Sequence, residues 1–130
     1  MRVFSFSFHQ SALPKDESGH GGGFIFDARA LPNPGREERF KSITGKDAAV
    51  IDYLSAQASV REFLASATSM VEASVKNYQE RSFNSLMVGF GCTGGRHRSV
   101  YLAEELARHF RGRQGLNVLV RHVEMEKLGK

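Results

Sequence analysis

A strand–helix–strand unit is predicted by residues 85–122, which read SLMVGFGCTGGRHRSVYLAEELARHFRGRQGLNVLVRH. The apolar run from Ser85 to Phe90 is typical of a buried strand. A helix follows, whose inner face carries apolar residues at spacings of three and four: Val100, Ala103, Leu106, Ala107 and Phe110. The helix ends near Gly112 or Gly115, and residues 117–122 form the second strand. Strands joined by such a crossover are parallel, and the connection is right-handed.

The residues before this unit predict two more strands and two more helices. Residues 3–8 alternate phenylalanine with serine, and residues 24–29 form another apolar run, so both segments are predicted as strands. Asp47 is placed to cap a short helix. A longer helix is predicted by a stripe of Val60, Phe63, Leu64, Ala67, Met70, Val71, Val75 and Tyr78. We therefore expect an α/β fold with a small mixed sheet, helices packed on it, a C-terminal βαβ unit and a polar tail.

Composition and length favour a single domain over residues 1–130. Of the 130 residues, 41% are hydrophobic and 25% are charged, which are ordinary values for a globular domain. There is no run of 18 apolar residues and no continuous apolar segment near residue 1, so neither a membrane span nor a secretory signal is predicted. The single cysteine forms no internal disulfide. We expect a cytoplasmic protein with no membrane partner, no metal and no cofactor.

The positive charge of the chain is concentrated at its end. Residues 1–90 contain ten basic and ten acidic residues, so the net charge of +4 belongs to residues 91–130. An excess of this kind indicates an anionic partner such as a phosphate, a nucleic acid or an acidic surface. A solvated basic face would give the same counts.

The glycine-rich segment GFGCTGGRHRS, residues 89–99, lies between a predicted strand and a predicted helix. Ligands of open α/β sheets bind at this kind of junction, where the first-turn N–H groups of the helix are unpaired. Glycines allow an anion to approach the backbone, and hydroxyl and basic side chains add donors. The predicted phosphate cradle consists of Thr93, Gly94, Gly95, His97, Arg98 and Ser99.

Two other phosphate-handling motifs can be compared with this segment. No GxxxxGK[ST] motif occurs, so the segment is not a Walker A loop. The spacing Cys-x5-Arg-Ser, formed by Cys92, Arg98 and Ser99, is that of cysteine-dependent phosphatases, in which a thiolate attacks phosphorus. Gly91 stands where those enzymes usually have a histidine. A Cys92 phosphatase therefore remains the alternative to noncatalytic binding.

Four segments together resemble a known family. FDARALPNP at residues 26–34, SITGKD at 42–47, GCTGGRHRSVYLAEELA at 91–107 and VLVRHVEMEK at 118–127 are similar to the C-terminal domain of the RapZ (YvcJ-type) proteins of bacteria, which are described as nucleotide-binding proteins or RNase adapters. The resemblance covers essentially the whole chain. It implies a fold like a phosphofructokinase subdomain, binding of small regulatory RNA, sensing of glucosamine-6-phosphate and self-assembly.

Carried over residue by residue, the resemblance places the sugar-phosphate site on Thr93, Gly94, His97 and Arg98, with Arg29 nearby. It implies an RNA-binding surface made from Arg108, Arg111, Arg113, Arg121, His122 and Lys127. An endoribonuclease, a separate P-loop protein and a second copy of the chain are the implied protein partners.

The sequence departs from the family pattern in three places. The P-loop kinase-like domain that normally precedes this domain is not in the sequence, so ATP binding is not expected. Residues 8–11 read Phe-His-Gln-Ser where the family has Phe-Lys-His-Gly. The last five residues are less basic than the family's tail, which weakens the RNA assignment more than the phosphate assignment.

Overall fold

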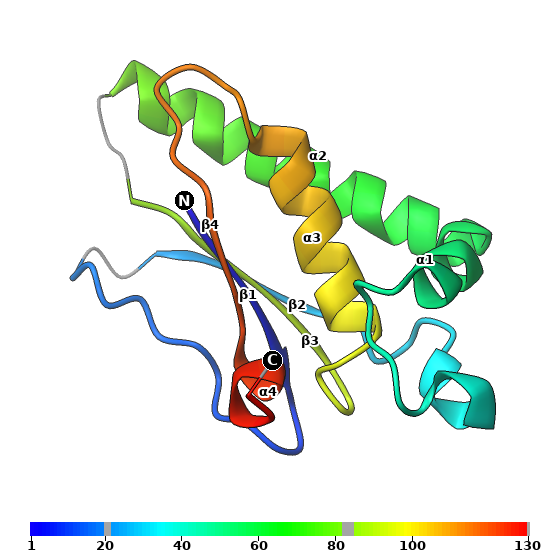
Figure 1. The fold of residues 1–130 in the computed structure, drawn as a ribbon. Coiled ribbons are helices and arrows are strands. Elements are labelled where there is room, and N and C mark those ends of the chain that lie inside the picture. Colours follow the sequence, from blue (N-terminus) through cyan, green and yellow to red (C-terminus); the bar gives the residue numbers. More distant parts are fainter. Residues whose placement is uncertain (20–21, 82–84, 130) are drawn as a thin grey trace.

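The computed structural model describes residues 1–19, 22–81 and 85–129, and Lys130 of the expected tail lies outside them. Four strands form one sheet in the order β2-β3-β1-β4 (Figure 1), namely β1 (Arg2–Ser7), β2 (Gly23–Asp27), β3 (Met87–Cys92) and β4 (Leu119–His122). All three pairings are parallel, whereas the sequence led us to expect a mixed sheet. The reason is that β3 lies between β1 and β2, so the segment joining those two strands crosses the sheet and cannot form a hairpin.

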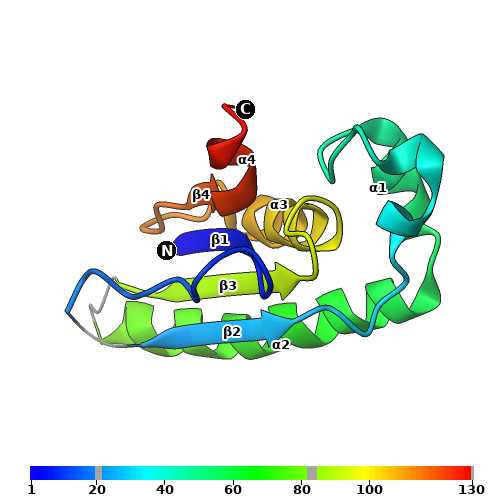
Figure 2. The same cartoon turned by 90° about the horizontal axis from the view of Figure 1, so that it is seen from below.

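The helices confirm the α/β class and the C-terminal βαβ unit. They are α1 (Ala48–Ser55), α2 (Ala58–Glu80), α3 (Arg98–Phe110) and α4 (Val123–Lys127), with short 3-10 turns η1 (Pro34–Arg36) and η2 (Glu38–Phe40). Both long helices lie on one side of the sheet (Figures 1 and 2). Phe63 of α2 packs edge-on against Phe26 of β2. Met70, predicted in the apolar stripe of α2, is 49% exposed and faces solvent. No helix within the described ranges is long and apolar enough to cross a bilayer.

Strand β1 is buried on both faces, although its alternation predicted one polar, exposed face. Ser5 and Ser7 are fully buried because β1 lies inside the sheet and beneath α3. The Ser5 hydroxyl lies 2.7 Å from Nδ1 of His122, and the Ser7 hydroxyl donates to the Thr93 carbonyl. These contacts satisfy the buried hydroxyls, which explains why serines are tolerated there.

The predicted polar tail instead forms α4 directly after β4. Met125 is its buried residue, and the Glu124 carboxylate accepts from Ser11 and pairs with Lys127. Helix α4 therefore packs against β1 and β4. Because all strands are parallel, their carboxyl ends meet at one edge, and the glycine-rich segment after β3 lies there (Figure 1).

Candidate functional site

The segment between β3 and α3 is shaped by two glycines with different roles. Gly95 has a φ of +73°, and a Cβ at this position would lie 2.9 Å from the backbone of Phe6 and Ser7. Gly95 is therefore required by packing. Gly94 is exposed, and a Cβ there would have nothing within 4 Å. The segment thus presents an open backbone surface at Gly94.

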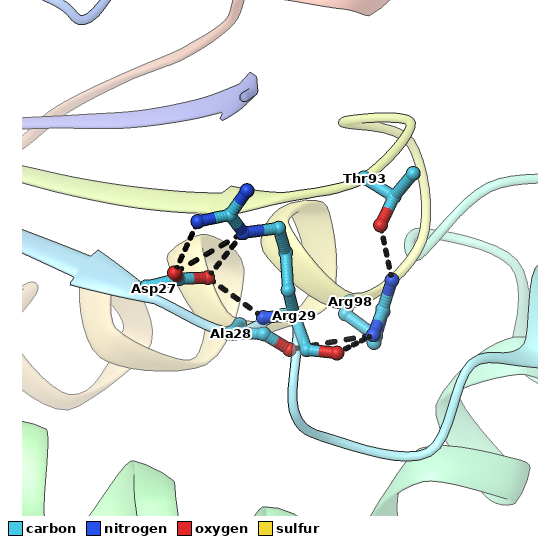
Figure 3. A network of polar contacts seen from close by, with 5 residues as sticks. All are labelled: Asp27, Ala28, Arg29, Thr93 and Arg98. Atoms are coloured by element: carbon cyan, nitrogen blue, oxygen red, sulfur yellow. Dashed lines mark hydrogen bonds and ion pairs between the residues drawn. The ribbon is translucent and has the colours of Figure 1, made fainter. Parts of the chain in front are cut away.

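The Arg98 side chain connects this segment to the chain leaving β2 (Figure 3). It is only 3% exposed. Its Nη1 donates to the carbonyl oxygens of Arg29 at 2.8 Å and Leu31 at 2.9 Å, and its Nη2 lies 3.3 Å from the Thr93 hydroxyl. Within the described chain its Nε is the buried side-chain nitrogen or oxygen that has no partner. The Nη1 group therefore holds the backbone after β2, while the Nε–H is a donor without an acceptor.

His97 and Ser99 are buried, and their side chains anchor the glycine-rich segment to the protein interior. His97 Nε2 lies 2.8 Å from the Phe40 carbonyl, and burial lowers the pKa of the His97 imidazole. The Ser99 hydroxyl lies 3.2 Å from the Cys92 sulfur. Both side chains point into the protein and away from a ligand at the surface of the segment. Of the predicted cradle, the Thr93–Gly94 backbone and Arg98 remain as possible ligand contacts.

Arg29 is engaged by its neighbour Asp27. The guanidinium donates to both carboxylate oxygens, at 2.9 Å through Nε and 2.7 Å through Nη2, and it lies 4.2 Å from the centre of the Phe8 ring. This pairing lowers the pKa of the Asp27 carboxyl. The resemblance led us to expect Arg29 near the sugar-phosphate site. In the structure Arg29 is paired with Asp27, and it also lines the pocket described in the next paragraph.

A pocket of about 460 Å³ lies beside this network, and we call it the arginine pocket. Its wall consists of Arg29, Ala30, Leu31, Pro32, Asn33, Arg36, Ser59, Thr93 and Arg98. None of the described residues in the wall is an aspartate or a glutamate. Three guanidinium groups without a carboxylate in the wall make the pocket suited to an anion.

Two long helices begin at the arginine pocket. Ser59 belongs to the first turn of α2, and Arg98 opens α3. Neither helix has a side-chain cap, and neither has an acidic residue in its first turn. The unpaired N–H groups and the positive end of each helix dipole are therefore uncompensated by the protein, which adds to the attraction for an anion.

The structure brings three of the predicted phosphate-binding residues to the pocket, Arg29, Thr93 and Arg98. The other six wall residues were not predicted, and three of them have polar side chains: Asn33, Arg36 and Ser59. The only sequence signals for them were the proline-containing LPNPGR run and a serine near a helix start. Neither signal shows that the two segments meet.

Cys92 is poorly placed for the phosphatase alternative. It is 2% exposed, and its sulfur lies among Ser99 and the Gly95 N–H, which donates to it at 3.3 Å. The Arg98 guanidinium, which would hold phosphate oxygens in such an enzyme, donates instead to backbone carbonyls. A buried thiol beside an arginine engaged in this way argues against attack on phosphorus.

The basic residues of the predicted RNA surface are mostly paired with carboxylates. The pairs are Arg108 with Glu105, Arg113 with Glu72, Arg121 with Glu126, Lys127 with Glu124, and His122 with Glu104. Arg111 is the exception in this part of the described chain. The pairs are spread over α2, α3, β4 and α4, and each places a carboxylate beside a cation, so these residues do not form a surface of unbalanced positive charge.

A larger pocket of about 860 Å³ lies at the other end of the strands, where their amino ends meet. It is lined by residues at the amino ends of strands and by the end of α2, including Met1, Gln79 and Leu119. Arg2 is the charged side chain in its described wall. Arg2 is paired with Asp16, and the N-terminal ammonium of Met1 donates to the Asn117 carbonyl, so this pocket lacks the three arginines of the arginine pocket.

Comparison with known proteins identifies relatives over nearly the whole chain. A nucleotide-binding protein of Thioalkalivibrio sulfidiphilus is 44% identical over 122 residues, which are 93% of this chain and 40% of the relative. A nucleotide-binding protein of Aeromonas hydrophila is 42% identical over 123 residues, 95% of this chain and 40% of the relative. One of Xylella fastidiosa strain M23 is 44% identical over 103 residues, 79% of this chain and 36% of the relative.

The chain thus spans about two fifths of the length of these relatives. A family model described as the RapZ C-terminal domain matches residues 1–126. This match agrees with the four segments from which the resemblance was drawn. The chain belongs to the RapZ C-terminal domain family.

Proposed function

We propose that this domain is a noncatalytic, regulatory binding domain that takes a phosphorylated small molecule into the arginine pocket. The phosphoryl group lies against the Thr93–Gly94 backbone at the start of α3. There it receives backbone N–H donors and a charge-assisted contact from Arg98.

The observation that carries this proposal is the excess of positive charge in the pocket, where Arg29 is paired with Asp27 but Arg36 and Arg98 form no ion pair within the described residues. The described wall contains three arginines and no carboxylate, and two uncapped helix starts border it. Arg98, a residue that is 3% exposed, has one side-chain N–H without an acceptor, so the protein does not fully satisfy its guanidinium. A turn with a purely structural role has no need for this arrangement.

The ligand is either a sugar phosphate, such as the amino-sugar phosphate that the resemblance implies, or a nucleotide. The relatives carry the name nucleotide-binding protein, which supports a nucleotide. None of the described wall residues is aromatic, so the pocket offers no ring for a base to stack on. This feature favours the sugar phosphate.

Calorimetric titration of glucose, glucose 6-phosphate, glucosamine 6-phosphate and AMP tests the proposal. Binding is expected only for the phosphorylated compounds. The Gly94→Val variant should weaken their binding at least tenfold, because its side chain fills the space over the backbone donors. Its urea midpoint should stay unchanged, because a Cβ at Gly94 meets nothing within 4 Å. Equal affinity for glucose and glucose 6-phosphate would refute a phosphate site.

The resemblance extends the proposal to an RNA backbone held by the C-terminal basic residues. The carboxylate pairs of Arg113 and Arg121 weaken the support for this part. RNA binding measured by fluorescence anisotropy should weaken with salt, with a log–log slope of about 0.7–0.9 per neutralised phosphate, and Arg111→Gln should flatten that slope. Absence of binding at low salt would leave only the small ligand.

A further inference from the structure

Besides Arg98, a serine at the end of β1 holds the glycine-rich segment in place. Ser7 is fully buried, and its hydroxyl donates to the Thr93 carbonyl. The same hydroxyl oxygen accepts from the N–H groups of His9 at 3.1 Å and Gln10 at 2.8 Å, which belong to the turn after β1. One side chain therefore fixes Thr93, the end of β1 and the following turn to one another.

This turn is joined to α4 through Ser11. The Ser11 hydroxyl accepts from the Ser7 N–H at 3.2 Å and donates to the Glu124 carboxylate. The ammonium of Lys127 lies 2.7 Å from the same carboxylate and donates to the Gln10 carbonyl at 2.8 Å. Residue 11 is a glycine in the family pattern, and glycine has no side chain for this contact. The bridge from the turn to α4 is therefore a feature of this chain.

Glu124 also packs directly on the glycine-rich segment. A Cβ at Gly95 would lie 2.7 Å from Cγ of Glu124, so the side chain of Glu124 covers this glycine. The Glu124 side chain is 11% exposed. Helix α4 has five residues, buries Met125 and packs against β1 and β4 (Figure 1). Because so short a helix is not stable by itself, its position depends on contacts of this kind.

We infer that Ser7, Ser11 and Glu124 are positioning residues, through which α4 holds the glycine-rich segment ready for the phosphoryl group. This inference rests on the proposed function, because it assigns what controls the affinity of the same site. None of the three lies in the described wall of the arginine pocket, so they act through the backbone of Thr93 and Gly95. Coupling between two sites is reciprocal. A phosphate bound at the segment therefore stabilises α4, and the packing of α4 responds to occupancy of the pocket.

The sign of the effect separates this role from simple electrostatics. A carboxylate near an anion site opposes anion binding, so loss of the Glu124 charge alone would raise the affinity for a phosphate. Loss of the support lowers the affinity, because the ligand must then order the segment as it binds. Glu126 is the matched control: it carries the same charge on the same helix, and it pairs with Arg121.

Titration calorimetry of glucosamine 6-phosphate against the whole chain tests the inference. We expect Glu124→Ala and Ser11→Ala to weaken binding about fivefold or more. Ser11→Thr, which keeps the hydroxyl, and Glu126→Ala should bind within about twofold of wild type. Hydrogen exchange of a peptide that covers residues 123–128 gives a second readout. Saturating ligand should slow this exchange in wild type about fivefold or more, and Ser11→Ala should lose most of that slowing.

The results separate this inference from the proposed function. If wild type binds the ligand and Ser11→Ala binds it equally well, the supporting role is overturned and the phosphate site stands. Tighter binding by Glu124→Ala, or equal losses in Glu124→Ala and Glu126→Ala, would overturn it in the same way. Ser11→Thr that binds as weakly as Ser11→Ala would reject the role of the hydroxyl. If wild type does not bind the ligand, the proposed function fails, and the inference fails with it.

Discussion

Replacing Arg98 with methionine tests whether this side chain holds the pocket together. The change removes the donors that bridge the start of α3 to the chain leaving β2, and methionine fills a similar length with an apolar side chain. Two of the lost contacts are short, at 2.8 Å to Arg29 and 2.9 Å to Leu31, and the contact with the Thr93 hydroxyl is longer.

The expected loss of stability follows from these contacts. A hydrogen bond from a charged donor contributes about 1.5–3 kcal/mol, so the two short bonds represent about 3–6 kcal/mol. Water from the pocket can reach the freed carbonyls, and methionine no longer buries a charge without a carboxylate, so part of the loss is offset. We expect the free energy of unfolding to fall by about 2–4 kcal/mol.

Urea denaturation followed by circular dichroism measures this loss. With an m-value of about 2 kcal/mol/M, the midpoint should fall by about 1–2 M. Arg96→Met is the matched control: the neighbouring Arg96 has one long contact, 3.3 Å to the Lys41 carbonyl, so its change should stay within about 0.5 kcal/mol. Arg98→Met with the stability of wild type would refute the bridging role and leave Arg98 as a residue for the ligand alone.

Three further predictions concern the residues around Arg98. Gly95→Ala should destabilise the fold by about 2–4 kcal/mol, because alanine is strained at positive φ and its Cβ would meet the backbone, whereas Gly94→Ala should stay within about 0.5 kcal/mol in thermal denaturation. Because burial lowers the pKa of His97 in the folded state, the unfolded state takes up the proton first, and stability should fall as the pH drops through about 6.5. His97→Gln should lessen that fall in urea titrations between pH 7.5 and 5.5, and the exposed His109→Gln should not. Hydrolysis of an aryl phosphate should stay at background, and turnover that disappears in Cys92→Ser would restore the phosphatase alternative.

The elements could be predicted from the sequence because their apolar periodicity is local. Val100 to Phe110 mark one face of α3, and the run before Cys92 marks β3, and both elements formed where they were expected. Two features depended on tertiary context. Ser5 is buried because β1 lies inside the sheet beneath α3, and its hydroxyl is satisfied by His122 of β4. Helix α4 buries Met125 and packs against β1 and β4. No local pattern carries that information.

The candidate site was predictable only in the segment that is continuous in sequence. Thr93, Gly94 and Arg98 stand within six residues, so a glycine-rich turn before a helix was sufficient to single them out. Arg36 and Ser59 reach the same pocket from segments far away along the chain, and only the fold brings them there. The contact of Arg98 with the carbonyls of Arg29 and Leu31 is likewise a product of the fold.

These contacts give stability and binding a common origin at the arginine pocket. Arg98 fixes the carbonyls of residues 29 and 31, and the chain then continues directly to Asn33 and Arg36, which also line the pocket. Arg98→Met should therefore lower both the free energy of unfolding and ligand affinity, because it frees the segment that carries Arg36. A phosphorylated ligand that contacts Arg98 at the start of α3 should in turn raise the urea midpoint of wild type more than that of Arg98→Met.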